Sequence, residues 1–581
     1  MLQIIKKMNV LLDKKQKRTM VGLIILMVIS AFLQTAGVGM LVEVMQIVID
    51  PEAVQHSRVA EACYEILGVQ SYRTFSIIVM VLLILVFVVK NLFTYFQQKL
   101  TLSFVYTNQF RTSERMMRNY LRRGYEFYLN ADTAVVQRSI TSDVNNMYAL
   151  ILALLQLLSD TVVSLFVISY CFISSGTMTI LMAVVLLSLM WLIKRVLKPV
   201  MYKAGKDNQD YYSGLFKWIS QTVQGIKEVK ISGKEQYFVS EYRKCGKGYV
   251  DAVQRYSLYN QVPKLLIETA CVATMVGYMI FLVATGVSTE NMLTVFGTLA
   301  AAALVLLPCV NRINNQINSI AYFEPFFMGV SDNLQDEING QNTDMSFATD
   351  EEEKLDVKDS IEMKDITYAY PNTERLIFDH ADLKIPVGAS VGIVGTSGAG
   401  KSTVVDILLG LLEPSTGHIY ADSVDVKEPG NYRKWLKNIG YIPQMIFMLD
   451  DTIRKNVAFG YADEDIDDAK VWEALKKARL DEFVRSLPEG LDTGIGERGI
   501  RISGGQRQRI GIARALFEDP EVLVLDEATS ALDNDTEAAI MESINSLHGH
   551  KTLIIIAHRL QTIEKCDIVY RVEHGEIERE R

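Results

Sequence analysis

The most informative stretch of the chain is Gly395-Thr-Ser-Gly-Ala-Gly-Lys401-Ser402-Thr403, which fits the pattern G-x-x-x-x-G-K-[ST]. The apolar run Ser390–Val394 before it predicts a strand, and the residues after Thr403 predict a helix. A glycine-rich loop between a strand and a helix is typical of a phosphate-binding site, because its backbone N–H groups can turn toward phosphate oxygens. In such a loop Lys401 would reach the β- and γ-phosphates, and Ser402 would bind Mg²⁺. The stretch therefore predicts a nucleotide-binding domain of the α/β class.

A second predicted strand, Val522–Leu525, ends in two carboxylates, Asp526 and Glu527. If this strand lies beside the phosphate-binding loop, Asp526 would hold the Mg²⁺ shell through water and Glu527 would polarise an attacking water. Taken alone, an Asp-Glu pair after a strand is more often an ordinary solvated strand end. The neighbouring loop reverses that preference and favours a catalytic interpretation.

The first 320 residues have a different character, because they contain six apolar segments long enough to cross about 30 Å of hydrocarbon. These segments lie near 20–42, 75–97, 149–172, 177–197, 265–286 and 291–311. The long loops 98–148 and 198–262 are rich in Lys and Arg, whereas the loops on the other side contain few. By the positive-inside rule, the long loops, both termini and the nucleotide-binding domain are expected in the cytoplasm.

The two long loops predict helices that continue beyond the bilayer. At their far ends, Ala131–Met147 and Gly214–Gln224 could form short transverse helices that press on a soluble domain, although solvated helical hairpins explain the pattern equally well. On the opposite side, Pro51–Leu67 has apolar residues near helical spacing. It predicts either an amphipathic helix on the outer membrane surface or a helix packed on a dimer partner.

Composition divides the chain into three parts: a membrane domain over 1–331, an acidic linker over 332–360 and the nucleotide-binding domain over 361–581. The 581 residues carry a net charge of −9, and the acidic excess lies in the C-terminal half. Nucleic-acid binding requires clustered positive charge, so no nucleic-acid partner is expected.

Further motifs make the chain resemble the ATP-binding cassette (ABC) transporters of the exporter kind. These motifs occur in that family's order and spacing: Tyr370 before Pro371, Gln444 in YIPQ, Gly496-Glu497-Arg498-Gly499, Ile502-Ser503-Gly504-Gly505-Gln506, Ser530-Ala-Leu-Asp533 and His558 in IIIAHR. One departure is Ile502, where the family signature usually has Leu. The resemblance implies a multi-domain membrane protein, in which a six-helix all-α transmembrane domain of the type I exporter fold precedes an α/β P-loop NTPase domain.

The resemblance also implies roles for individual residues, with ATP and Mg²⁺ as cofactors. Glu527 would be the catalytic base, His558 would contact the γ-phosphate, and Gln444 would contact Mg²⁺ and sense the membrane domain. Tyr370 would stack on adenine. The remaining ATP-binding positions on the phosphate side are Gly395, Ser397, Gly398, Gly400, Lys401, Ser402 and Thr403, and those expected to complete the site of another copy are Ser503, Gly504, Gly505, Gln506 and Asp533.

Because the family closes ATP between two cassettes and this chain contains one, a dimer is required. The cassette keeps every catalytic position, including Glu527, which favours a homodimer in a lipid bilayer.

For the substrate, the stretch Gly225–Glu235 (GIKEVKISGKE) resembles bacterial flippases for lipid-linked oligosaccharides. Lys90, Lys264 and Arg312 are predicted near the cytoplasmic leaflet, where they could pair with the diphosphate of a lipid-linked sugar or merely snorkel toward water. Three functions remain open: a flippase of a lipid-linked oligosaccharide or polysaccharide precursor in the cytoplasmic membrane of a bacterium, an exporter of drugs, hydrophobic compounds or lipids with the same architecture, and a membrane-tethered regulatory ATPase without transport. The intact Glu527 counts against the regulator.

Overall fold

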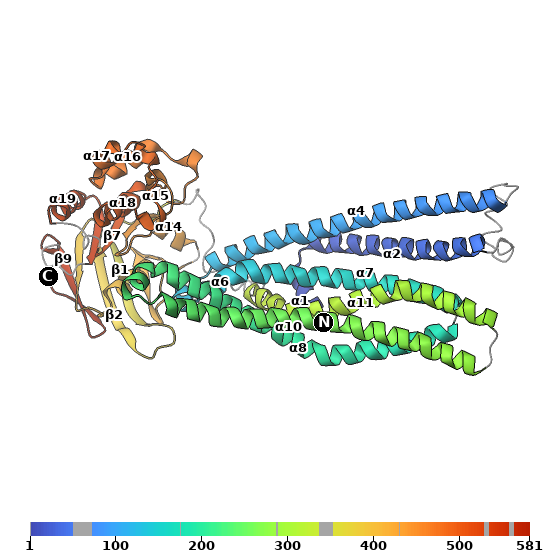
Figure 1. Cartoon of the computed structure of the whole chain (residues 1–581). Helices are drawn as coiled ribbons and strands as arrows, with labels where there is room; N and C mark the ends of the chain where they lie inside the picture. The colour runs from blue at the N-terminus through green and yellow to red at the C-terminus, as the bar shows by residue number, and fades with distance from the viewer. Residues whose placement is uncertain are drawn as a thin grey trace. The chain divides into compact units, whose positions relative to one another are not determined.

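The computed structural model describes residues 2–49, 72–174, 176–285, 289–335, 353–428, 430–527, 534–556 and 563–581. The chain forms two compact units, coloured along the sequence in Figure 1. The helical unit comprises Met1–Arg123 and Ala131–Met345, and the sheet unit comprises Gly124–Asn130 and Ser346–Arg581. The sheet unit thus includes one short segment that the sequence assigned to the membrane domain.

Long helices build the helical unit. They are α1 (Leu2–Leu11), α2 (Lys14–Ile49), α4 (Tyr72–Leu121), α6 (Thr133–Arg138), a π-helical turn (Ser139–Asp143), α7 (Val144–Ser174), α8 (Gly176–Gln224), α9 (Ile226–Ser232), α10 (Glu235–Ala284) and α11 (Thr289–Asn333). Helix α11 packs along α7 and α8, α10 packs along α8, and α2 packs along α4 and α7 (Figure 1).

The length and apolar composition of these helices make several of them able to cross a membrane. Among the described residues, five helices are long and apolar enough to cross a membrane: those over Lys14–Gly37, Arg73–Leu121, Thr133–Ser169, Ile180–Gln224 and Glu235–Phe281. Helices α4, α8 and α10 extend well past the predicted apolar segments, as the long basic loops suggested. The sixth predicted segment, 291–311, lies in α11, but most of its side chains are outside the described residues, as is the whole predicted surface helix 51–67.

Within the predicted range Ala131–Met147 the structure has the short helix α6, which continues through the π-helical turn into α7, whereas no separate helix begins at Gly214. Residues 214–224 are the last part of the continuous helix α8, because Gly214 does not break the helix but allows it to approach Cys245 closely. A separate short helix, α9, follows at Ile226–Ser232 and ends at Gly233, whose φ of 61° is left-handed. In the first long loop, the short helix preceding Ala131–Met147 is α5 (Tyr125–Asn130) of the sheet unit.

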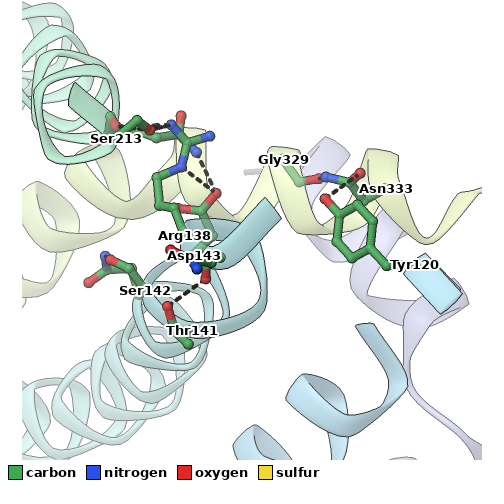
Figure 2. A network of polar contacts seen from close by, with 11 residues as sticks. Tyr120, Arg138, Thr141, Ser142, Asp143, Ser213, Gly329 and Asn333 are labelled. Carbon is green, nitrogen blue, oxygen red and sulfur yellow. Dashed lines mark hydrogen bonds and ion pairs between the residues drawn. The ribbon is translucent and has the colours of Figure 1, made fainter. Parts of the chain in front are cut away.

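Buried polar contacts connect the ends of the helices in the helical unit (Figure 2). The Arg138 Nε lies 3.2 Å from the Asp143 Oδ2, and their side chains are 11% and 2% exposed. Asp143 also accepts a hydrogen bond from the Gln209 Nε2 at 2.9 Å, which links the π-helical turn to α8. Farther along, the Tyr120 hydroxyl donates to the Asn333 Oδ1 at 3.1 Å and links α4 to α11. These polar contacts specify which helix faces meet, which the apolar segments alone do not determine.

The sheet unit contains two sheets. An antiparallel sheet has the order β2-β1-β4-β5, and a six-stranded, mostly parallel sheet has the order β10-β9-β3-β8-β7-β6. The strands are β1 (Ser360–Ala369), β2 (Leu376–Pro386), β3 (Ser390–Val394), β4 (Thr416–Ala421), β5 (Val424–Asp425), β6 (Ile439–Ile442), β7 (Val522–Asp526), β8 (Thr552–Ile556), β9 (Ile568–Glu573) and β10 (Glu576–Arg579). Strands β3, β7 and β8 are buried throughout, as expected for parallel strands covered on both faces.

Helices cover the sheets of this unit. They are α13 (Lys401–Leu408), α14 (Asn431–Lys437), α15 (Ile453–Val457), α16 (Asp468–Lys477), α17 (Asp481–Ser486), α18 (Gly504–Phe517) and α19 (Asn534–Asn545). The predicted all-α part followed by an α/β part is therefore confirmed. Strand β1 begins at Ser360, and most of the predicted linker 332–360 lies outside the described residues.

The register of the parallel strands positions the site. Ile393 at the end of β3 pairs with Ile556 of β8, and Ile556 also pairs with Asp526 of β7. The carboxyl ends of β3 and β7 therefore meet at one edge of the sheet. This brings the phosphate-binding loop beside the two carboxylates, as in other open parallel sheets.

Candidate nucleotide site and membrane cavity

The loop between β3 and α13 is held in a shape that requires glycine. Gly400 has a φ of +107°, and a Cβ there would lie 2.9 Å from the Ile377 Cγ2 and from the Phe378 Cζ. The side chain of Lys401 is buried, and its Nζ donates to the carbonyl oxygens of Gly395 and Thr396, both at 3.1 Å. The ammonium group is therefore held over the loop, where a phosphate would meet it.

The carboxylates at the end of β7 lie next to this loop. Asp526 is 7% exposed and is hydrogen-bonded to Ser402 and Tyr441. Burial raises the pKa of Asp526, and the hydrogen bond from Ser402 opposes that rise. Glu527 has a left-handed φ of 49° and accepts a hydrogen bond from the Gln444 Nε2 at 2.7 Å. The structure thus brings Lys401, Ser402, Asp526, Glu527 and Gln444 to one place.

Sequence reasoning missed one carboxylate of this cluster, Asp406 of α13. Burial and the nearby charge of Asp526 together raise the pKa of Asp406 to about 6. The Asp526 carboxylate and the Ser402 hydroxyl, which are hydrogen-bonded to each other, form an oxygen donor set that fits Mg²⁺, which is usually held by one or two carboxylates together with substrate phosphates. In the described part of the chain, no group of three or more His, Cys, Asp or Glu could hold a metal ion by itself. The one available signal was an aspartate inside the otherwise apolar run that follows the loop.

Tyr370 lies beside the phosphate-binding loop. The Tyr370 hydroxyl is 2.9 Å from the Thr403 Oγ1, and the Tyr370 ring meets the Tyr368 ring edge-on at 5.3 Å. Tyr370 is only partly buried. Ser397 and Gly398 form the turn of the loop itself, and Gly398 has a φ of +79°.

The signature residues are not joined to this cluster. Ser503 is the N-cap of α18, where its Oγ accepts from the Gln506 N–H at 3.2 Å and its own N–H donates to the Gln506 Oε1 at 2.8 Å. Ser503 and Gly504 are exposed, and Gly505 and Gln506 are partly exposed. Within the described residues, no hydrogen bond or ion pair links these four to the phosphate-binding loop. Asp533 and His558 lie outside the described residues.

In the helical unit, two of the three predicted cations line one cavity of about 510 Å³ between α2, α4, α7 and α11. These are Lys90 and Arg312, whereas Lys264 is exposed and does not line it. Arg312 also has an acidic partner within the helical unit, because its Nε donates to the Asp160 Oδ1 at 2.7 Å. Asp160 was also missed, although it is the only acidic residue in the apolar segment 149–172.

Comparison with known proteins gives consistent results across the chain. Residues 378–530 match the model of the ABC transporter family, and residues 20–307 match that of the ABC transporter transmembrane region. A lipid A-core flippase of Burkholderia orbicola is 29% identical over 468 residues, which cover 80% of this chain and 76% of the relative. One of Coxiella burnetii is 34% identical over 362 residues, 62% of this chain and 59% of the relative.

The fold is also similar to that of a solved structure described as a bacterial Atm1-family ABC exporter with ATP bound. The match covers 97% of this chain and 95% of the chain of that exporter, with a TM-score of 0.78 and 22% sequence identity. That likeness confirms the type I exporter fold. The matches over both units show that this chain belongs to the ABC transporters, as an exporter with a membrane-spanning domain and an ATP-binding domain that hydrolyses ATP to drive transport.

Proposed function

We propose that this exporter moves a lipid-linked oligosaccharide or polysaccharide precursor across the cytoplasmic membrane of a bacterium by alternating access. The observation that carries the proposal is the polar cavity in the helical unit, which has Lys90 and Arg312 on its wall. Support also comes from the relatives, which are named ATP-dependent lipid A-core flippases. A polar cavity between membrane-spanning helices suits a lipid with a polar headgroup better than a wholly apolar compound.

For the ATP chemistry, we infer that Glu527 is the general base. Its carboxylate is already oriented by the Gln444 amide, so it can accept a proton from a water that attacks the γ-phosphate. Lys401 would bind the β- and γ-oxygens after it leaves the loop carbonyls, and Tyr370 would stack on adenine. Mg²⁺, held by Ser402, Asp526 and Gln444, would neutralise charge on the phosphates. We assign His558 to the γ-phosphate by the family resemblance alone.

We further propose a homodimer with two ATP sites. Each site would combine the phosphate-binding loop of one copy with the signature residues Ser503–Gln506 and Asp533 of the other. The exposed N-terminus of α18 supports this arrangement, because it offers free N–H groups and no described bond ties it to the loop of its own chain. One chain alone would bind ATP on one side only.

A second candidate, an exporter of drugs or other hydrophobic compounds, is favoured by one observation. The helical unit has an apolar groove of about 730 Å³ on one face of α10. Its lining residues are Val272, Met275, Val276, Met279, Ile280, Val283 and Ala284. These seven described lining residues are all apolar, so contact with lipid tails explains this groove equally well.

The test replaces Lys90, Lys264 and Arg312 by Gln in one variant. The purified protein is reconstituted in proteoliposomes, and transport of a labelled diphosphate-linked oligosaccharide lipid is measured per folded dimer. We expect transport to fall about tenfold or more, because charge-assisted hydrogen bonds to phosphate are lost. A matched control replaces three exposed cations outside the cavity, Lys203, Arg243 and Lys247, by Gln and should transport normally. Unchanged transport in the first variant would show that these cations do not bind the substrate. The drug exporter would then be as well supported as the flippase.

A further inference from the structure

Amide side chains dominate the wall of the cavity between α2, α4, α7 and α11. Six of its lining residues are amides: Gln34, Asn91, Gln97, Gln98, Gln156 and Gln316. Three more carry hydroxyls: Thr94, Thr101 and Ser159. The volume of about 510 Å³ lies within the usual range for ligand sites, about 300–1,000 Å³. Such a wall is unusual between helices that cross a membrane, because polar groups facing hydrocarbon are costly.

Internal hydrogen bonds use only part of the capacity of these amides. The Gln316 Nε2 donates to the Gln156 Oε1 at 2.8 Å, and the Gln97 Nε2 donates to the Thr101 Oγ1 at 3.1 Å. Each amide has two N–H donors and a carbonyl acceptor, so donors and acceptors remain on the same wall. A ligand with many hydroxyl groups satisfies both kinds at once, because each hydroxyl both donates and accepts.

The charges on the wall almost cancel. The Asp160 side chain is 13% exposed and pairs with Arg312, which is 47% exposed. Lys90 lies over the Phe87 ring at 4.1 Å, and within the described residues no ion pair is found for it. Each chain therefore offers about one uncompensated positive charge here. The pairing leaves other N–H groups of Arg312 able to donate hydrogen bonds, but it removes the net attraction for a second anionic charge.

We propose that this cavity binds the sugar headgroup of the lipid, with the amides bonding sugar hydroxyls and Lys90 pairing with one phosphate charge. Asp160 acts as a positioning residue that holds Arg312 as a hydrogen-bond donor rather than a free cation. The inference rests on the proposed function and deepens it by naming which part of the substrate lies where. Recognition of the substrate then depends on its sugar more than on its total charge.

The first test measures binding to the full-length protein in nanodiscs without nucleotide. The probes are two fluorescent lipids with the same tail and one phosphodiester charge, one with a disaccharide and one without sugar. We expect the disaccharide lipid to bind at least about tenfold tighter, the size of one or two well-made hydrogen bonds. Replacing Gln156 and Gln316 together by Met, which is close in shape but lacks the amide, should reduce that preference to about twofold.

The matched control replaces Gln137 and Gln224, which are exposed and outside the cavity, by Met and should keep the preference. If the cavity pair does not fold, Gln98→Met serves instead, because Gln98 is exposed on the wall and no internal bond is found for it in the described part of the chain. Equal binding of the two lipids by the wild-type protein would overturn the inference, as would a preference retained in the amide variants.

The second test concerns Asp160 and uses the diphosphate-linked disaccharide lipid. Asp160→Asn frees Arg312 and should tighten binding of this probe about tenfold, whereas Arg312→Gln should weaken it. Combining both changes restores the net charge but not the Arg312 donor, so the affinity should recover from the Arg312→Gln value most of the way toward the wild-type value, which a purely structural role would not produce. Asp207→Asn, which breaks the exposed pair with Arg255, should change nothing. Failure of the double variant to restore affinity would contradict the role of Asp160.

These outcomes are separable from those of the proposed function. Sugar-dependent binding without ATP-driven transport would contradict the proposed flippase function but would still support the headgroup-binding site. If the glycosylated and sugar-free lipids bind equally well and are transported at equal rates, the protein is a lipid flippase and the proposed sugar-binding site is contradicted.

Discussion

The sheet unit and the helical unit position their functional side chains by different physical means. In the sheet unit, backbone pairing between β3, β8 and β7 brings the phosphate-binding loop to Asp526 and Glu527. In the helical unit, the cavity takes residues from four separate helices, and only side-chain packing and polar contacts decide which of them meet. We therefore expect single substitutions in the sheet unit to abolish function by removing a group that takes part in ATP chemistry. In the helical unit, we expect them to act by disturbing helix packing or the balance of charges.

The largest effect is expected from Glu527→Gln in the sheet unit. The substitution keeps a group that can accept the Gln444 hydrogen bond but removes the base, so ATP hydrolysis should fall about 100-fold or more while ATP binding persists. Phosphate release and nucleotide binding by the purified chain in nanodiscs measure both quantities. Glu542→Gln, an exposed change on α19, is the control and should hydrolyse ATP normally. Hydrolysis above about a tenth of the wild-type rate in Glu527→Gln would show that another group activates the water.

A smaller effect, on stability, is expected from Asp143→Ala in the helical unit. The change leaves Arg138 buried without its carboxylate and also removes the acceptor for Gln209, so the free energy of unfolding should fall by about 3 kcal/mol. Thermal unfolding in detergent, followed by tryptophan fluorescence, provides the measurement.

The smallest effect on stability is expected at the exposed ion pair between Asp207 and Arg255, which serves as the comparison for the buried Asp143. Its atoms lie 3.4 Å apart and its side chains are 28% and 49% exposed, so Asp207→Ala should cost less than about 1 kcal/mol. Equal destabilisation by Asp143→Ala and Asp207→Ala would contradict the importance given to the network in Figure 2.

The same difference explains what the sequence could predict. The loop 395–403 and the strand ending in Asp526 and Glu527 were predictable, because each motif is local and the parallel sheet brings strand ends together. Asp406 was missed because it belongs to no motif and matters only through its proximity to Asp526.

In the helical unit, the apolar segments were predictable from length and composition, but their contacts were not. Asp160 meets Arg312 across about 150 residues of sequence, and the rotation of α7 against α11 decides that contact. Likewise, a separate short helix was predicted over Gly214–Gln224, whereas α8 continues through Gly214, which lies close to Cys245. Such contacts depend on which helix faces meet, which periodicity alone does not specify.

In the proposed function, ATP hydrolysis in the sheet unit drives a glycosylated lipid through the helical unit. Its most direct test is the sidedness of a fluorescent lipid-linked oligosaccharide in sealed proteoliposomes whose ATP-binding domains face outward. After ATP is added, an impermeant quencher should reach progressively less of the label, and a non-hydrolysable ATP analogue or Glu527→Gln should abolish this change. The account is contradicted if the wild-type protein hydrolyses ATP at a steady rate while the fraction of protected label stays the same with and without ATP.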